Sequence, residues 1–224
     1  MKWKVLKMNN FENMKTMIDD YILKNGIEQN IVSCLHDTSK NDSEKGKPIV
    51  YLYENKNDLQ VIDMDTIAKY CYKMIKNPEN PGENPVNSAD AFLINSDNDW
   101  YFIEFKDKPI QAAKSGLKDN IIKKAYSNWY MLMDILYEMQ NTKSKYPDFE
   151  FDNPIKFAQE HVYYILVCTI NKNPEVYKQI KNMELINSTY TPPFMCRLKG
   201  YLFKDTYVYT EDFLERKFVN NFVY

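Results

Sequence analysis

The sequence predicts an α/β protein in which a mixed sheet is flanked by helices. Apolar residues recur at helical spacing near the start, alternate with a period of two in the middle, and later return to helical spacing. The chain has 224 residues, of which 44% are hydrophobic and 27% charged. That length and balance suit a packed core, so we expect a single domain over residues 1–224.

The first quarter of the chain predicts a helix followed by two strands. Residues 10–25 place apolar side chains at helical spacing, and Gly26 follows as a stop. The segment PIVYLYE, residues 48–54, alternates as a strand does. We expect it to pair as a hairpin with LQVIDM, residues 59–64.

The middle of the chain predicts a second helix and a hairpin. Residues 65–76 have helical spacing, and Asp65 is the expected N-cap. A loop rich in proline and asparagine follows at 77–88. ADAFLI and WYFIEFK then alternate around the turn-rich NSDND, which predicts an antiparallel hairpin over residues 90–106.

The second half predicts a long helix, a central strand and a closing unit. Residues 117–139 keep one apolar face and are expected to be helical. HVYYILVCTI, residues 161–170, is a continuous apolar run typical of a strand covered on both faces. Further strands are expected at CRLKGYLF (196–203) and TYVYT (206–210), with a final helix over 211–222.

Composition excludes several functional classes. Twenty-nine Lys and Arg against 31 Asp and Glu give a net charge of −2, so any nucleic-acid site must be local. No apolar run is long enough for a membrane helix or a signal peptide, so we expect a cytoplasmic protein without a membrane partner. Five glycines form neither GxGxxG nor GxxxxGK[ST], which argues against dinucleotide enzymes and P-loop NTPases.

Cysteine and histidine are too sparse to predict a familiar metal or nucleophile site. The four cysteines show no pair at ligand spacing, which argues against a zinc module and a disulfide framework. His36 and His161 are the two histidines, so a Ser-His-Asp triad has little material. His36 precedes Asp37, but adjacent residues rarely face each other, so we set this pair aside as loop residues.

One constellation stands out on the predicted hairpin. Asp90 opens its first strand, while Glu104 and Lys106 lie on one face of the second. Antiparallel pairing brings the start of one strand beside the end of the other, so the three side chains should converge. Carboxylates with open water positions suit Mg²⁺ or Mn²⁺, which polarise phosphate and activate water.

These residues resemble the PD-(D/E)xK nuclease superfamily, which has the restriction-endonuclease-like fold. SADAFLI followed by DWYFIEFK is similar to its signature, an acid and then Glu-x-Lys on adjacent strands. The order of predicted elements matches the family's αβββαβ core over roughly residues 63–172. The resemblance implies that Asp90, Glu104 and the Phe105 carbonyl ligate Mg²⁺ or Mn²⁺, and that Lys106 positions or activates the attacking water.

The sequence departs from the family pattern in two places. Ala89 stands where the family name has proline, and the predicted helix over 65–76 contains no Glu, a ligand in some members. The leading strand of the core stays open between PIVYLYE and LQVIDM. A different interpretation of Asp90, Glu104 and Lys106 is an exposed hairpin face carrying solvated charges.

A local positive charge surrounds the constellation. Residues 105–128 hold six lysines against Asp107 and Asp119. Backbone phosphates attract such a patch without sequence preference, although a solvated helix face would look the same. Asn128 falls within an apolar stripe, where it either faces the site or bonds the backbone. We expect nucleic-acid contacts from Lys108, Lys114, Lys118 and Lys124.

The leading expectation is therefore a Mg²⁺-dependent nuclease that hydrolyses phosphodiester bonds, with DNA favoured over RNA. A homodimer and a protein partner both stay open. The alternative is a non-catalytic protein that keeps the nuclease fold for binding, in a larger complex or in phage defence.

Overall fold

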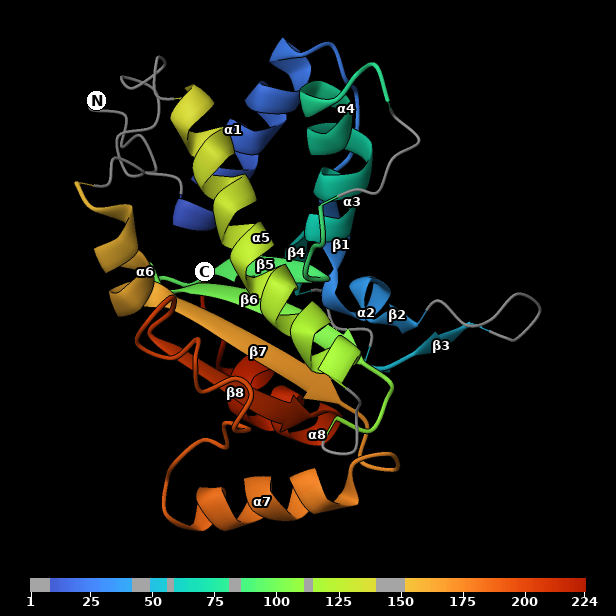
Figure 1. Cartoon of the computed structure of the whole chain (residues 1–224), viewed down its shortest axis with the longest axis vertical. Coiled ribbons are helices and arrows are strands. Elements are labelled where there is room, and N and C mark those ends of the chain that lie inside the picture. The colour runs from blue at the N-terminus through green and yellow to red at the C-terminus, as the bar shows by residue number, and fades with distance from the viewer. Residues whose placement is uncertain (1–8, 42–48, 56–58, 81–85, 111–114, 140–151) are drawn as a thin grey trace, which may run out of the picture.

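The computed structural model describes residues 9–41, 49–55, 59–80, 86–110, 115–139 and 152–224. Within these residues the protein is α/β, with a mixed sheet flanked by helices (Figure 1). The sheet runs, in spatial order, through β1 (Val32–Cys34), β4 (Gln60–Asp63), β5 (Ala91–Ile94), β6 (Trp100–Lys106), β7 (Val162–Cys168) and β8 (Asp205–Thr210).

The helices expected at 10–25, 65–76, 117–139 and 211–222 are all present. The first is α1 (Asn10–Lys24) and the third is α5 (Ser115–Met139). The second is a continuous helix made of α3 (Met64–Thr66), the π-helical η1 (Ile67–Tyr72) and α4 (Lys73–Lys76). The last consists of α8 (Glu211–Phe213), η4 (Leu214–Phe218) and η5 (Val219–Asn221). Three further helices escaped prediction: α2 (Leu35–Thr38), α6 (Pro154–His161) and α7 (Pro174–Leu185). Among the described residues, no helix is both long and apolar enough to span a membrane.

The sheet combines an antiparallel half with a parallel half. β1, β4, β5 and β6 are joined antiparallel, while β7 runs parallel to both β6 and β8. The predicted hairpin is confirmed, with Ala91 opposite Ile103 and Ile94 opposite Trp100. The predicted central strand is confirmed as β7, which is hydrogen-bonded along both edges. Because β6, β7 and β8 are parallel, their carboxyl ends meet at one edge of the sheet.

Two strand predictions are wrong. PIVYLYE does not pair with LQVIDM: β3 (Val50–Tyr51) pairs with β2 (Lys40–Asn41) in a separate two-stranded sheet, and β4 pairs with β1 and β5. Burial explains the difference. The adjacent residues Val61 and Ile62 of β4 are both fully buried, as in an internal strand, whereas Val50 of β3 is exposed.

The segment 196–203 is not a strand either. It forms a series of turns with a single isolated bridge between Lys199 and Phe203. Gly200 has a φ of +74°, and the Leu198 carbonyl accepts from the amides of both Leu202 and Phe203. A chain that turns back on itself at a left-handed glycine cannot continue as an extended ladder.

Side chains alternate between two packed faces of the sheet. Phe92, Phe102 and Tyr164 belong to the cluster shared with α1 and α5. Ile103 and Ile165 belong to the cluster on the opposite face, which the C-terminal helix η4 covers. The period of two therefore directs Glu104 and Lys106 toward α5, which crosses this face over β5 and β6 (Figure 1).

We expect the central strand to carry much of the stability. Leu166→Ala should lower the free energy of unfolding by about 2–5 kcal/mol, because Leu166 is fully buried in β7 and truncation leaves a cavity. Leu185→Ala is the matched control: Leu185 is 84% exposed, so its effect should stay within about 0.5 kcal/mol. Denaturant unfolding of both variants measures the difference, and equal losses would contradict the assigned core.

Candidate active site

The hairpin brings Asp90 beside the Glu104-x-Lys106 tripeptide. Asp90 directly precedes β5, and its backbone amide donates to the Ile103 carbonyl at 3.0 Å. Its side-chain Oδ2 accepts a hydrogen bond of 2.6 Å from the backbone amide of Phe105. Backbone and side chain together therefore hold Asp90 against the strand that carries Glu104.

Glu104 is fully buried and bound by two lysines. Lys124 Nζ lies 2.8 Å from Oε1 and 2.9 Å from Oε2, and Lys106 Nζ forms an ion pair with Oε1. The interpretation of Glu104 as a solvated charge on an exposed hairpin face is therefore wrong. An ionised carboxylate can lie in a protein interior when it is paired in this way.

Lys124 connects α5 to both acids. Its ammonium lies 3.9 Å from Asp90 Oδ1 as well as against Glu104, and 13% of its side chain is exposed. Burial alone would lower the pKa of Lys124, but the Glu104 and Asp90 carboxylates more than offset it and raise that pKa. The amine therefore stays charged, and the cluster contains two acids and two amines.

The surroundings of Asp90 disfavour the charged form of its carboxyl. Burial raises the pKa of its carboxyl well above the usual aspartate value, and the charge of Glu104 raises it further. Lys124, Lys106 and the Phe105 amide act in the opposite direction without cancelling the shift. Two carboxylates this close repel each other, and the resulting rise in pKa falls on Asp90.

A polar cavity of about 670 Å³ opens over the cluster at the carboxyl end of β6. Ligands of open α/β sheets commonly bind at the carboxyl ends of parallel strands. The walls of this cavity come from six parts of the chain: α2 with β2, Leu52 after β3, the end of β4 with α3 and η1, the approach to β5, the end of β6, and α5. Asp90, Lys106 and Lys124 all line it.

Asp65, which the sequence predicted to be a helix N-cap, instead lines the cavity. The N-cap of the 64–76 helix is Asp63, whose Oδ1 accepts from the Thr66 amide at 2.8 Å. The predicted N-cap role of Asp65 is therefore wrong. Asp65 instead accepts a hydrogen bond from Ser88 Oγ, forms an ion pair with Lys69 and helps to raise the pKa of Lys124.

The other predicted contact residues lie in varied places. Phe105 lines the cavity. Lys108 is exposed just beyond β6, and Lys118 Nζ lies 5.9 Å from the centre of the Phe194 ring. Lys124 turns into the acid cluster and does not form part of an outer lysine surface. Lys114 lies outside the described residues.

Two buried polar atoms near the cluster have no hydrogen-bond partner in the described part of the chain. Asn128 donates to the Lys124 carbonyl at 2.6 Å, so it bonds the backbone, but its Oδ1 is unpartnered. The buried Tyr164 hydroxyl is also unpartnered. Burial raises the pKa of Tyr164, and the charges of Glu104 and Asp90 raise it further, so the phenol stays protonated beneath the site.

The donor set fits a hard divalent cation. Asp90 and Glu104 supply carboxylate oxygens from adjacent strands, and their mutual repulsion is the kind of strain that a cation relieves. The ammonium of Lys124 is the positive charge that now lies against both carboxylates. A metal ion and this amine would compete for the same oxygens.

Comparisons with known proteins give no assignment. No protein-family model, no curated protein and no solved structure matches the chain. The functional conclusion rests on the geometry of the site.

Replacing Asp90 with Asn tests the raised pKa. The folded state binds the Asp90 proton more tightly than the unfolded chain, so the wild-type protein loses stability as the pH rises above the usual aspartate value of 3.8. Asp90→Asn keeps an acceptor for the Phe105 amide and removes this loss. We expect the variant to be more stable than wild type at neutral pH, with a gain that shrinks as the pH falls toward 3.8.

Denaturant unfolding across that pH range, with a chelator present, measures the gain. Asp97→Asn is the control, because Asp97 is exposed in the turn between β5 and β6. A gain for Asp90→Asn that does not change with pH would contradict the assignment.

Proposed function

We propose that this protein is a metal-dependent nuclease that hydrolyses phosphodiester bonds at Asp90, Glu104 and Lys106. Asp90, Lys106 and Lys124 line one polar cavity, and the buried Glu104 pairs with both lysines; this convergence carries the proposal. Two acids and two amines on adjacent elements are suited to handling a phosphate, a water and a divalent cation together.

The order of elements supports a restriction-endonuclease-like core. β4, β5 and β6 form an antiparallel meander, α5 follows, and β7 returns parallel to β6. This is the arrangement that the resemblance implies, with LQVIDM in the position of the leading strand. Asp65, at the start of the helix after β4, adds an acid to the cavity although the helix lacks a Glu.

Each residue has a role that follows from its place. Asp90, Glu104 and the Phe105 carbonyl would hold Mg²⁺ or Mn²⁺. When bound, such an ion polarises the phosphate and lowers the pKa of a coordinated water. Lys106, which pairs with Glu104 and lines the cavity, would hold the attacking water beside the carboxylate. Lys124, once displaced from Glu104, would face the negative charge of the phosphate.

The pairing of Glu104 with two lysines favours a second function, that of a non-catalytic binding protein. Two ammonium groups already bind Glu104: Lys124 contacts both of its oxygens, and Lys106 pairs with Oε1. A cluster neutralised in this way could serve as a structural element in a non-catalytic binding protein. Affinity for divalent ions separates the two functions.

Purified protein should cleave a nucleic acid when Mg²⁺ or Mn²⁺ is present. Glu104→Gln and Lys106→Met should each lower the rate about 100-fold or more, since each removes a group acting on the water or the ion. Lys178→Met is the control, because Lys178 is exposed on α7 and lies outside the cavity. A panel of single- and double-stranded DNA and RNA identifies the substrate, and full activity in both site variants would refute the proposal.

Lys124→Met tests competition between the amine and the ion. Removing the ammonium leaves Glu104 paired with Lys106, and it vacates the space beside Asp90. We expect the variant to bind Mn²⁺ more tightly than wild type and to gain more thermal stability from a given Mn²⁺ concentration.

Calorimetry and thermal unfolding measure these two effects. An Asp90→Ala, Glu104→Ala double variant should lose the Mn²⁺ response altogether. If neither wild type nor Lys124→Met binds Mn²⁺, the non-catalytic function stands instead.

A further inference from the structure

A second group of ligand-type side chains lies at the junction of β1 and α2. Cys34, His36 and Asp37 each offer one ligand atom, and these three atoms all lie within 4.8 Å of one another. His36 Nδ1 lies 3.0 Å from Asp37 Oδ1. The expectation that His36 and Asp37 do not face each other is therefore wrong.

The backbone holds this group in place. Cys34 ends β1 opposite Gln60 of β4, and the Leu35 amide donates to the Leu59 carbonyl at 3.0 Å. On the other side, Ser39 Oγ donates to the His36 carbonyl at 2.6 Å. The turn that carries the three side chains is fixed at both ends.

The His36 ring is held as well. It is buried and stacks on Tyr51 of β3, with ring centroids 4.1 Å apart and planes tilted by 23°. An imidazole fixed by an aromatic neighbour cannot rotate freely away from its partners. Ligands arranged before the ion arrives bind it with a smaller loss of conformational entropy.

The chemistry of the three groups favours a transition metal. A thiolate is a soft donor, an imidazole a borderline donor and a carboxylate a hard one, and Zn²⁺ accepts all three. Mg²⁺ prefers oxygen ligands alone, so it would not select this group. Three protein ligands are the usual number for a zinc site that keeps a fourth position for water or substrate.

A catalytic thiol is the other chemistry that these residues suggest. Burial raises the pKa of Cys34; of its two hydrogen bonds with Asp37, the one with the backbone lowers that pKa and the one with the side chain raises it, and the net direction is upward. A reactive cysteine needs a lowered pKa, so a nucleophile is disfavoured. A metal ion would instead displace the thiol proton on binding.

From the geometry we infer that Cys34, His36 and Asp37 form a binding site for Zn²⁺ or a chemically similar divalent transition-metal ion. Asp37 lines the same cavity as Asp90, whereas Cys34 and His36 do not, so the ion would lie behind the part of the wall that Asp37 forms. The site does not depend on the nuclease proposal, because none of its ligands belongs to the Asp90 and Glu104 cluster.

Cobalt spectroscopy tests this site. Co²⁺ should be titrated into the reduced, full-length protein without a histidine tag and in a buffer that does not chelate metals. We expect the near-ultraviolet charge-transfer band of a thiolate bound to Co²⁺, together with visible bands of low coordination number. Zn²⁺ should abolish both by displacing Co²⁺.

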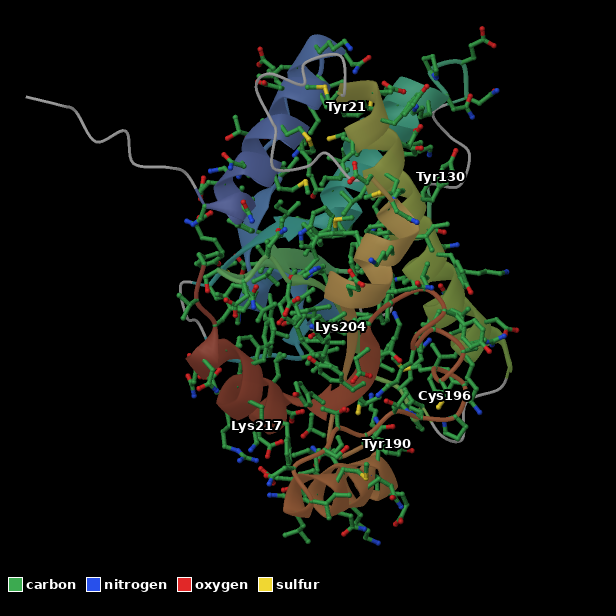
Figure 2. All side chains as sticks on the ribbon, turned by 90° about the vertical axis from the view of Figure 1, so that its left-hand side faces the viewer. Tyr21, Tyr130, Tyr190, Cys196, Lys204 and Lys217 are labelled. Carbon is green, nitrogen blue, oxygen red and sulfur yellow. The ribbon has the colours of Figure 1, made fainter. Side chains whose placement is uncertain are left out.

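Matched variants locate the metal ion. Cys34→Ser should eliminate the charge-transfer band. Cys196→Ser should keep it, because Cys196 lies in the turns before β8 and does not belong to the ligand group (Figure 2). Asp37→Asn should weaken Co²⁺ binding about tenfold or more. The Asp37 side chain is 60% exposed, so the substitution should leave the fold intact.

Glu104→Gln separates this site from the nuclease cluster. It should keep the Co²⁺ band, even if the nuclease proposal is correct and the variant is inactive. The inference is overturned if wild type shows no thiolate band, if the band survives Cys34→Ser, or if Asp37→Asn binds Co²⁺ as wild type does.

Discussion

The burial of the Glu104 carboxylate between two lysines is the interaction on which the arrangement of this protein depends. An ionised carboxylate inside a sheet face is strongly unfavourable unless cations reach it. Lys106 reaches it from the same strand and Lys124 from α5. Because the second cation comes from the helix, α5 must cross the sheet where its ammonium meets Glu104. The position of α5 in turn sets one wall of the cavity.

The cost of this arrangement falls on Asp90. Its carboxyl is held in place by the Phe105 amide at a position where burial and Glu104 both disfavour its charge. A protein selected for stability alone would place an apolar side chain or an amide there. Groups that oppose folding in this way tend to mark functional sites.

Periodicity in the sequence was enough to predict the hairpin that joins Asp90 to Glu104, the α5 helix and the β7 strand. Each depends on local repetition of apolar residues over many positions. The inward direction of Lys124 could not be predicted, since it depends on how α5 lies across the sheet. Asp63 and Asp65 are both suited to cap a helix, and spacing alone does not distinguish them. The pairing of β3 with β2 could not be predicted either, because each strand has two residues, too few to show an alternation of apolar and polar side chains.

The link between Glu104 and Lys124 also bears on how the chain folds during synthesis. Lys124 follows Glu104 by 20 residues. The hairpin that carries Glu104 therefore leaves the ribosome before α5, the helix whose Lys124 pairs with the Glu104 carboxylate. Until α5 has emerged, Glu104 has Lys106 alone as a partner, and water solvates the carboxylate better than a half-formed core does. The hairpin should therefore stay open until α5 docks, and the two should close together. The pair that shapes the cavity would then also set the order in which the nascent chain becomes compact.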